Sequence, residues 1–331
     1  MRSSIAKDLF DRKGVKYTAD QIVVSNGAKQ SVLQTLMSVV SPGDKVIIPA
    51  PYWTSYPDMV KICGGIPTVI DTLAADNYVL TAKSLRKALS EHPETTALIL
   101  CNPSNPTGSV ADQQAQADLA TVLLDFPKVV VISDEIYERL TYDVPHTSFA
   151  SLPGMFDRTV TINGFSKSHS MTGYRLGYSA SGIQIAKANS KIQSQMTSCA
   201  SSVSQFAANV ALRDVPESWM AEKVVELKKK RDFAYAILNK IPDITCPKPD
   251  GAFYLLPDIS RYFGRVTKGG REVKNSHELC LELLREEGVA LVSGDAFGAP
   301  PCLRISYAAS FEMIEGSLSR LASFLASLQE K

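Results

Sequence analysis

The stretch Asn163-Gly164-Phe165-Ser166-Lys167-Ser168-His169-Ser170-Met171-Thr172-Gly173-Tyr174-Arg175-Leu176-Gly177 holds a single lysine in a mostly uncharged neighbourhood, with one arginine eight residues later. Lysines usually cluster with other charges on solvated faces, so Lys167 is unusual. A lysine shielded from water has a lowered pKa, and its neutral amine is a nucleophile that forms Schiff bases with carbonyl compounds. A surface lysine in a serine-rich loop is the alternative, and the rest of the chain decides between them.

Composition excludes several classes of function. The 331 residues, 45% of them hydrophobic, suffice for one large domain and a smaller one. A net charge of +1 without a long basic stripe argues against nucleic acid or an anionic membrane as a partner. Six cysteines and four histidines without ligand spacing argue against a metal site, and the cysteines favour a reducing compartment. There is no transmembrane run of ~20 apolar residues and no secretory signal.

Short apolar strands alternate with helices from about residue 20 onward. This alternation predicts a largely parallel sheet covered on both faces. From about residue 190 the pattern changes and predicts a smaller α+β domain. The expected strands cover 22–24, 45–49, 67–70, 97–101, 129–133, 159–162, 289–292 and 303–307, and the expected helices cover 28–40, 56–63, 84–90, 112–124, 217–239 and 276–287.

Several polar residues directly follow predicted strands, which is where ligands bind in open α/β sheets. Gly27, Ala28 and Lys29 follow one strand and open a helix, an arrangement that suits a phosphate. A glycine before a helix is more often only a turn, and the stretch is neither a dinucleotide fingerprint nor a P-loop. Trp53 follows the next strand and fits either core packing or a flat face against an aromatic ligand.

Two further strand ends carry polar groups. The loop Asn102–Gly108 contains two Asn-Pro steps, which force a sharply turned path and can aim an amide at a ligand. Asp134 and Tyr137 follow the strand 129–133. A carboxylate at the end of a buried strand must be paired, and a protonated ring nitrogen would pair it. Each feature alone has an ordinary structural explanation, but together they match one cofactor, pyridoxal 5′-phosphate (PLP).

In these features the sequence resembles the class I, fold-type I, PLP-dependent aminotransferases, over essentially its whole length. His146–Gly154 is similar to the plastid-type aspartate aminotransferases that also act on prephenate. The resemblance implies an α/β fold of fold type I: a large domain with a mostly parallel seven-stranded sheet and a smaller α+β C-terminal domain. The motifs that carry it are Ser25-Asn26-Gly27-Ala28-Lys29-Gln30, Pro49-Ala50-Pro51-Tyr52-Trp53, Asn102–Gly108, Ser133-Asp134-Glu135-Ile136-Tyr137, Asn163–Gly177 and Arg304-Ile305-Ser306-Tyr307.

The resemblance implies catalytic roles for Lys167, Asp134 and Tyr137. Lys167 would bind the cofactor covalently and then carry a proton between the substrate's Cα and the cofactor's C4′. Asp134 would keep the pyridine nitrogen protonated, so that the ring accepts electrons. Asn105 and Tyr137 would hydrogen-bond the ring's 3-oxygen, and Trp53 would stack on the ring.

The phosphate of the cofactor has its own implied contacts. Arg175 and the backbone of Gly27, Ala28 and Lys29 would hold it. Ser166 is a further candidate, because the phosphate-binding serine that some subgroups carry three positions before the lysine is a glycine here.

Substrate contacts are implied at four positions. Arg304 would bind the α-carboxylate with its guanidinium fork, and Trp53 and Asn105 would border the substrate. Lys29 is similar to a lysine that recognises a distal carboxylate, so we interpret it as the residue that sets a preference for dicarboxylates.

The resemblance also predicts how the chain is divided. Residues 1–20 would be the remnant of an N-terminal small-domain segment, 21–215 the large PLP-binding domain and 216–331 the small C-terminal domain. Family members carry a preceding segment with a Gly-Glu-Pro-Asp-Phe stretch and a tyrosine that reaches the neighbouring subunit's cofactor, so we interpret the chain as N-terminally truncated and expect a homodimer. We expect the plastid as its compartment if the full-length form carries a transit peptide, and the cytoplasm otherwise.

Three functions remain open. The first is PLP-dependent transamination between aspartate or glutamate and 2-oxo acids, with prephenate as a further acceptor. A PLP enzyme of different specificity, either an aromatic aminotransferase or a C–S lyase, would share Lys167, Asp134 and Arg304, and Lys29 favours the dicarboxylates. The third is a non-catalytic, truncated PLP-binding copy. The residues before Ile22 are too few for a helix-turn-helix, which argues against a fused regulator.

Overall fold

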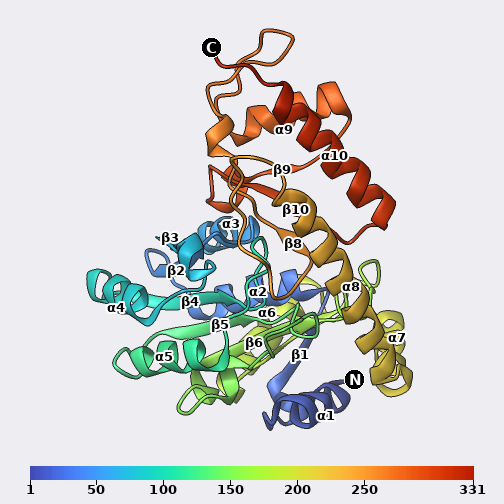
Figure 1. Ribbon diagram of the computed structural model, residues 1–331. Helices are drawn as coiled ribbons and strands as arrows, with labels where there is room; N and C mark the ends of the chain where they lie inside the picture. The colour runs from blue at the N-terminus through green and yellow to red at the C-terminus, as the bar shows by residue number, and fades with distance from the viewer.

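A seven-stranded sheet forms the centre of the larger part of the molecule, and a three-stranded sheet lies in the smaller part (Figure 1). The computed structural model describes residues 1–331. The prediction of an α/β fold with a mostly parallel seven-stranded sheet and a smaller α+β part is confirmed. None of the helices is both long enough and apolar enough to span a bilayer.

The large sheet has the strand order β1-β7-β6-β5-β4-β2-β3. Strands β2 to β6 pair in parallel, whereas β7 is antiparallel to both of its neighbours. The carboxyl ends of β1, β2, β4, β5 and β6 therefore meet at one edge, where the polar residues were predicted to lie. The strands are β1 (Ile22–Ser25), β2 (Lys45–Ala50), β3 (Ile66–Asp71), β4 (Thr95–Cys101), β5 (Val130–Asp134), β6 (Thr159–Gly164) and β7 (Gly177–Ala180).

Helices cover both faces of this sheet. Successive side chains of a strand point to opposite faces, so Val46 and Ile48 pack with helices α2 (Ala28–Val39) and α3 (Ser55–Ile62). Ile47, between them, packs with helices α4 (Ala82–Glu91) and α5 (Gln113–Leu124). This two-sided burial explains why the strands read as almost continuous apolar runs.

Helix α1 (Arg2–Lys13) packs beside β1 and β7. Its buried residues Ile5 and Leu9 join Tyr178 of β7 in one apolar cluster. We expected residues 1–20 to belong to the small domain, but these contacts place the helix against the large sheet. The physical reason is its apolar stripe, which is buried by the sheet edge rather than by the smaller part.

The smaller part contains helices around a short antiparallel sheet in which β10 is central. Its core is a separate cluster of 21 buried residues, to which the last three helices and the strands of the small sheet contribute. The elements not yet given are α6 (Ile183–Met196), α7 (Ser202–Asp214), α8 (Glu217–Leu238), β8 (Tyr254–Leu255), α9 (Ser276–Glu287), β9 (Val292–Ser293), β10 (Leu303–Ser306) and α10 (Phe311–Ser327).

Candidate active site

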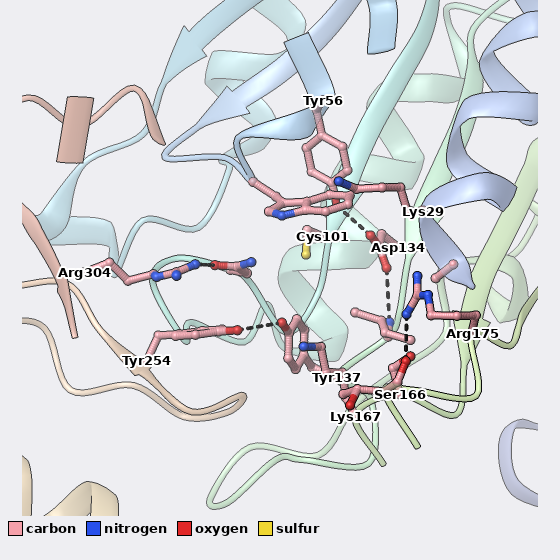
Figure 2. A pocket seen from close by; sticks show the side chains of 15 residues that line it. Lys29, Tyr56, Cys101, Asp134, Tyr137, Ser166, Lys167, Arg175, Tyr254 and Arg304 are labelled. Atoms are coloured by element: carbon pink, nitrogen blue, oxygen red, sulfur yellow. Dashed lines mark hydrogen bonds between the residues drawn. The ribbon is translucent and has the colours of Figure 1, made fainter. Parts of the chain in front are cut away.

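A cavity of about 390 Å³ opens at the carboxyl ends of the large-sheet strands, where loops of the smaller part approach them (Figure 2). Every predicted site residue except Gly27 lines it, and Gly27 lies directly behind one wall. The structure thus brings together residues at or after the carboxyl ends of five strands, β1, β2, β4, β5 and β6, and one residue of β10. The lining residues predicted from the sequence are Ala28, Lys29, Trp53, Asn105, Asp134, Tyr137, Ser166, Lys167, Arg175 and Arg304.

One corner of the cavity is suited to an anion. Gly27 caps helix α2 with φ of +89°, and a Cβ atom there would lie 2.6 Å from the Arg175 guanidinium. Glycine therefore permits the close approach of the arginine to the helix N-terminus. The backbone N–H groups of Ala28 and Lys29 begin the helix without protein acceptors, and no acidic residue lies in its first turn. These free donors and the helix dipole attract negative charge.

Backbone packing explains the glycine three positions before Lys167. Gly164 pairs with Gly177 across β6 and β7, and a Cβ atom at Gly164 would lie 2.8 Å from the carbonyl oxygen of Leu176. A serine would not fit there. Ser166 lines the cavity near Arg175 instead, as Figure 2 shows.

Asp134 forms the floor of the cavity and is buried. It accepts hydrogen bonds from the Tyr56 hydroxyl at 2.7 Å and from the Ile136 backbone N–H at 3.2 Å. Both donors are neutral, so the carboxylate lacks a paired cation. Burial raises the pKa of Asp134 to about 6. A buried carboxylate with this surplus of negative charge fits a ligand that brings a protonated nitrogen.

Lys167 lies across the cavity from Asp134, above two aromatic rings. Its Nζ is 5.8 Å from the centre of the Tyr137 ring and 5.5 Å from that of Phe253. Burial, together with the charges of Arg304 and Arg175, lowers the pKa of Lys167. A larger share of the amine is therefore neutral and nucleophilic than in an exposed lysine.

Arg304 projects from β10 into the cavity. Its guanidinium lies 4.7 Å from the ring centres of both Tyr254 and Phe297 and donates a hydrogen bond of 3.0 Å to Asn105 Oδ1. It has no acidic partner, and its buried Nε has no acceptor at all. Two aromatic rings fix the plane of this arginine, and an anionic ligand would complete its hydrogen bonding.

Lys29 and Trp53 line a further part of the cavity. The Lys29 Nζ lies 4.9 Å from the centre of the Trp53 ring, without an acidic partner. The whole lining contains four basic side chains, Lys29, Lys167, Arg175 and Arg304, against the single carboxylate of Asp134. This excess of positive charge fits a ligand with several anionic groups, such as a phosphate and carboxylates.

The sequence did not reveal five residues that line the cavity. Tyr254 lies outside the predicted strands and helices, yet its hydroxyl is 2.9 Å from the hydroxyl of Tyr137. Tyr56 follows Trp53 by one helical turn, and that spacing was the available signal. The others carry no pattern of their own. The five residues are Tyr56, Cys101, Ile136, Thr172 and Tyr254.

A family model described as aminotransferase class I and II matches residues 1–321. The chain belongs to this family. A bifunctional aspartate aminotransferase and glutamate/aspartate-prephenate aminotransferase of Petunia hybrida is 45% identical over 99% of this chain, which spans 69% of the Petunia protein. An aspartate aminotransferase of Pinus pinaster is 44% identical over 98% of this chain, which spans 66% of its length.

Solved structures of this family share the fold. The crystal structure of the aspartate aminotransferase from Rhizobium meliloti superimposes with a TM-score of 0.95 at 39% identity, over 99% of this chain and 82% of that one. The family match and the superposition of the backbone therefore both support the α/β fold of fold type I that the sequence predicts.

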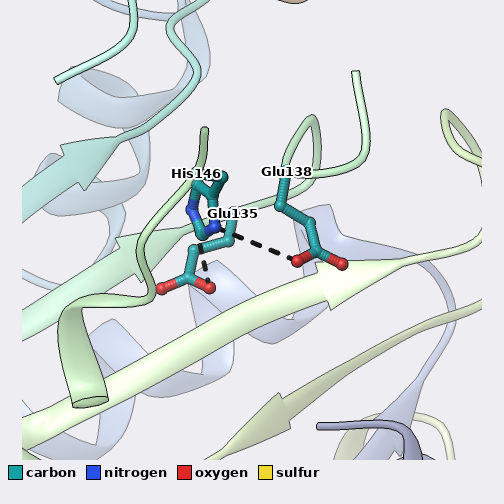
Figure 3. Close-up of side chains that lie close together, drawn as sticks. All are labelled: Glu135, Glu138 and His146. Atoms are coloured by element: carbon teal, nitrogen blue, oxygen red, sulfur yellow. Dashed lines mark ion pairs between the residues drawn. The ribbon is translucent and has the colours of Figure 1, made fainter. Parts of the chain in front are cut away.

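Behind the floor of the site, the other face of the Asp134–Tyr137 segment carries buried charges. Figure 3 shows Glu135, Glu138 and His146 close together. The Lys13 Nζ lies 2.7 Å from a Glu135 oxygen and 2.8 Å from a Glu138 oxygen, and Arg12 lies 2.8 Å from Glu138. Lysine and arginine of helix α1 thus neutralise the carboxylates, and the cluster is an ion-pair network that ties α1 to the end of β5.

Replacement of Lys13 should destabilise the protein. Lys13→Met would leave Glu135 and Glu138 buried without this cation, and breaking a buried pair costs about 3–5 kcal/mol. Burial raises the pKa of both glutamates, but the charge of Lys13 is the largest of the effects that oppose this rise, and the pKa of each is lowered overall. Their contribution is therefore complete above the ordinary carboxylate pKa and is lost as the pH falls. Urea unfolding followed by circular dichroism measures the effect at pH 7.

The exposed Lys16 provides the matched control for this prediction. Lys16→Met should leave the free energy of unfolding within about 0.5 kcal/mol of the parent value. Equal stabilities of the Lys13 and Lys16 variants would contradict the role of the network.

Proposed function

We propose that this chain is a PLP-dependent aminotransferase that exchanges amino groups between aspartate or glutamate and 2-oxo acids, with prephenate as a further acceptor. The observation that carries the proposal is the placement of Lys167, Asp134 and Arg304 around one cavity. The names of the Petunia and Pinus relatives support the choice of substrates.

The residues of the cavity fit PLP. Arg175 and the N-terminus of helix α2 would hold its phosphate, with Ser166 beside them. Asp134 would receive the ring nitrogen, and Trp53 would cover one face of the ring. When bound, the cofactor supplies an aldehyde that condenses with amines and a pyridine ring that withdraws electrons.

The side chains of the chain itself would direct the reaction. Arg304 would hold the α-carboxylate of the substrate and so place its Cα within reach of Lys167. The neutral Lys167 amine would accept the proton from the substrate's Cα and deliver a proton to the cofactor's C4′. Asn105 and Tyr137 would hydrogen-bond the 3-oxygen of the ring, and Tyr254 supports the Tyr137 hydroxyl at 2.9 Å.

Lys29 would give the preference for dicarboxylates. Like Arg304, Lys29 lines the cavity without an acidic partner, and its Nζ lies 4.9 Å from the centre of the Trp53 ring. An amino acid with two carboxylates would bridge Lys29 and Arg304, whereas an aromatic amino acid would engage Arg304 alone.

We expect Lys29→Ala to raise KM for L-aspartate by about 10- to 100-fold, because a charge-assisted hydrogen bond is lost, and to change KM for L-phenylalanine by less than about threefold. Steady-state kinetics with 2-oxoglutarate as acceptor measures both values. Lys29→Arg, which keeps the charge, should retain most of the aspartate affinity. Equal effects on the two substrates would remove Lys29 from this role.

The same kinetic measurements distinguish the proposed function from the three alternatives. An aromatic aminotransferase would use L-phenylalanine better than L-aspartate, and a C–S lyase would release pyruvate and ammonia from cystathionine. A non-catalytic copy would bind PLP and turn over none of these substrates.

The assembly and division of the chain are part of the proposal. A homodimer is supported by Val203 and Phe206, which expose 73% and 74% of their surfaces at the start of helix α7. The boundary between residues 215 and 216 stays a prediction, as does the plastid for a form that carries a transit peptide.

A further inference from the structure

We propose that Tyr56 is a positioning residue of the cofactor site: its hydroxyl holds the Asp134 carboxylate in the ionised form and in the orientation that receives the ring nitrogen. This inference rests on the proposed function, because it concerns the binding of PLP. The sequence analysis assigned no role to Tyr56, and its contact with Asp134 is seen only in the structure.

The hydroxyl of Tyr56 is directed at Asp134, and the Cys101 thiol lies beside this pair. The Tyr56 side chain is 2% exposed, and its hydroxyl donates to Asp134 Oδ2 at 2.7 Å. Asp134 Oδ1 accepts from the Ile136 backbone N–H. Each carboxylate oxygen thus has one donor, and the plane of the carboxylate is defined by two fixed elements, helix α3 and the turn after β5.

Tyr56 also couples this carboxylate to the stacking ring. The Tyr56 backbone N–H donates to the Trp53 carbonyl at 3.0 Å, and the two rings pack edge to face with centres 5.3 Å apart. One turn of chain therefore presents Trp53 to the ring face of a ligand and Tyr56 to the residue at the ring nitrogen, as Figure 2 shows for Tyr56 and Asp134. A shift of one would move the other.

The chemistry of the pair requires a phenol. Burial and the neighbouring carboxylate raise the pKa of Tyr56 well above its ordinary value, so it remains a donor. Burial raises the pKa of Asp134, and the Tyr56 hydrogen bond is the largest effect that opposes this rise. Without the hydroxyl, Asp134 would be protonated at higher pH. The titratable groups that face Asp134 from the packed elements are Tyr56 of α3, Cys101 of β4, Glu135 and Tyr137 after β5, and Lys167 after β6.

The test measures the Kd of PLP by equilibrium dialysis between pH 5.5 and 9. It compares three cofactor-free proteins, namely the parent and the variants Tyr56→Phe and Tyr17→Phe. Tyr17 is the matched control, because it is also buried and its hydroxyl contacts Thr161 rather than the cavity. We expect Tyr56→Phe to raise the Kd of PLP about tenfold near pH 7. The pH below which affinity falls should move up by about one unit. Tyr17→Phe should change neither quantity.

A second probe separates positioning from packing. A PLP analogue with carbon in place of the ring nitrogen cannot form an ion pair with an ionised Asp134. Tyr56→Phe should therefore alter the Kd of this analogue by less than about twofold. Equal losses of affinity for PLP and the analogue, or an unchanged pH profile, would overturn the inference while leaving the proposed function intact. Absence of PLP binding in the parent protein would overturn both.

Discussion

Lys167→Ala is expected to lower the rate of transamination by about ten-thousandfold or more. The lining contains one other lysine, Lys29, and its amine lies over the Trp53 ring, 4.9 Å from the ring centre. Removal of Lys167 takes away both the group that attaches the cofactor and the group that moves the proton at Cα. Neither task has a substitute in the lining.

Single-turnover and steady-state assays with L-aspartate and 2-oxoglutarate measure this loss. Lys83→Ala, which truncates an exposed lysine of helix α4, should keep the parent rate. Addition of a small primary amine should restore part of the activity of Lys167→Ala, because it can take over the proton transfer without the side chain. A Lys167→Ala protein that works at the parent rate would contradict the assignment of the site.

Arg304→Ala is expected to reduce kcat/KM for L-aspartate by about a thousandfold, which corresponds to about 4 kcal/mol. The guanidinium is held between Tyr254 and Phe297, and it has an unsatisfied buried Nε. Its donors are thus arranged for a bidentate carboxylate before any substrate arrives. Loss of that fork leaves the α-carboxylate without its principal partner and Cα out of position.

The loss should concern every amino acid, because all share the α-carboxylate. In this it differs from the effect of Lys29→Ala, which depends on the side chain of the substrate. Arg261→Ala, an exposed arginine of the smaller part, is the control. A change in kcat/KM of less than about threefold in Arg304→Ala would show that another residue binds the carboxylate.

Much of the fold could be predicted because the parallel strands are short, apolar and buried on both faces. Their carboxyl ends then locate Gly27, Trp53, Asn105 and Asp134 without knowledge of distant contacts. Strand β7 was missed, because it has only four residues and turns back antiparallel beside β6. Helices α6 and α7 were missed as well.

The site could be predicted only where a motif marks it. Lys167, Arg175 and Arg304 stand out because each is an isolated cation in a recognisable stretch. Tyr254 and Tyr56 reach the cavity through tertiary packing, and an aromatic residue in a helix reads as core. The contacts of helix α1 could not be predicted either, because the ion pairs of Lys13 with Glu135 and Glu138 join residues more than a hundred positions apart.

The most direct test of the central claim is the visible absorption spectrum of the purified chain with PLP, recorded before and after addition of L-glutamate. We expect an absorption band of the cofactor bound at Lys167, which L-glutamate bleaches as its amino group is transferred and 2-oxoglutarate is released. A band that L-glutamate leaves unchanged, or no band at all, would contradict the claim that this chain binds PLP and carries out transamination.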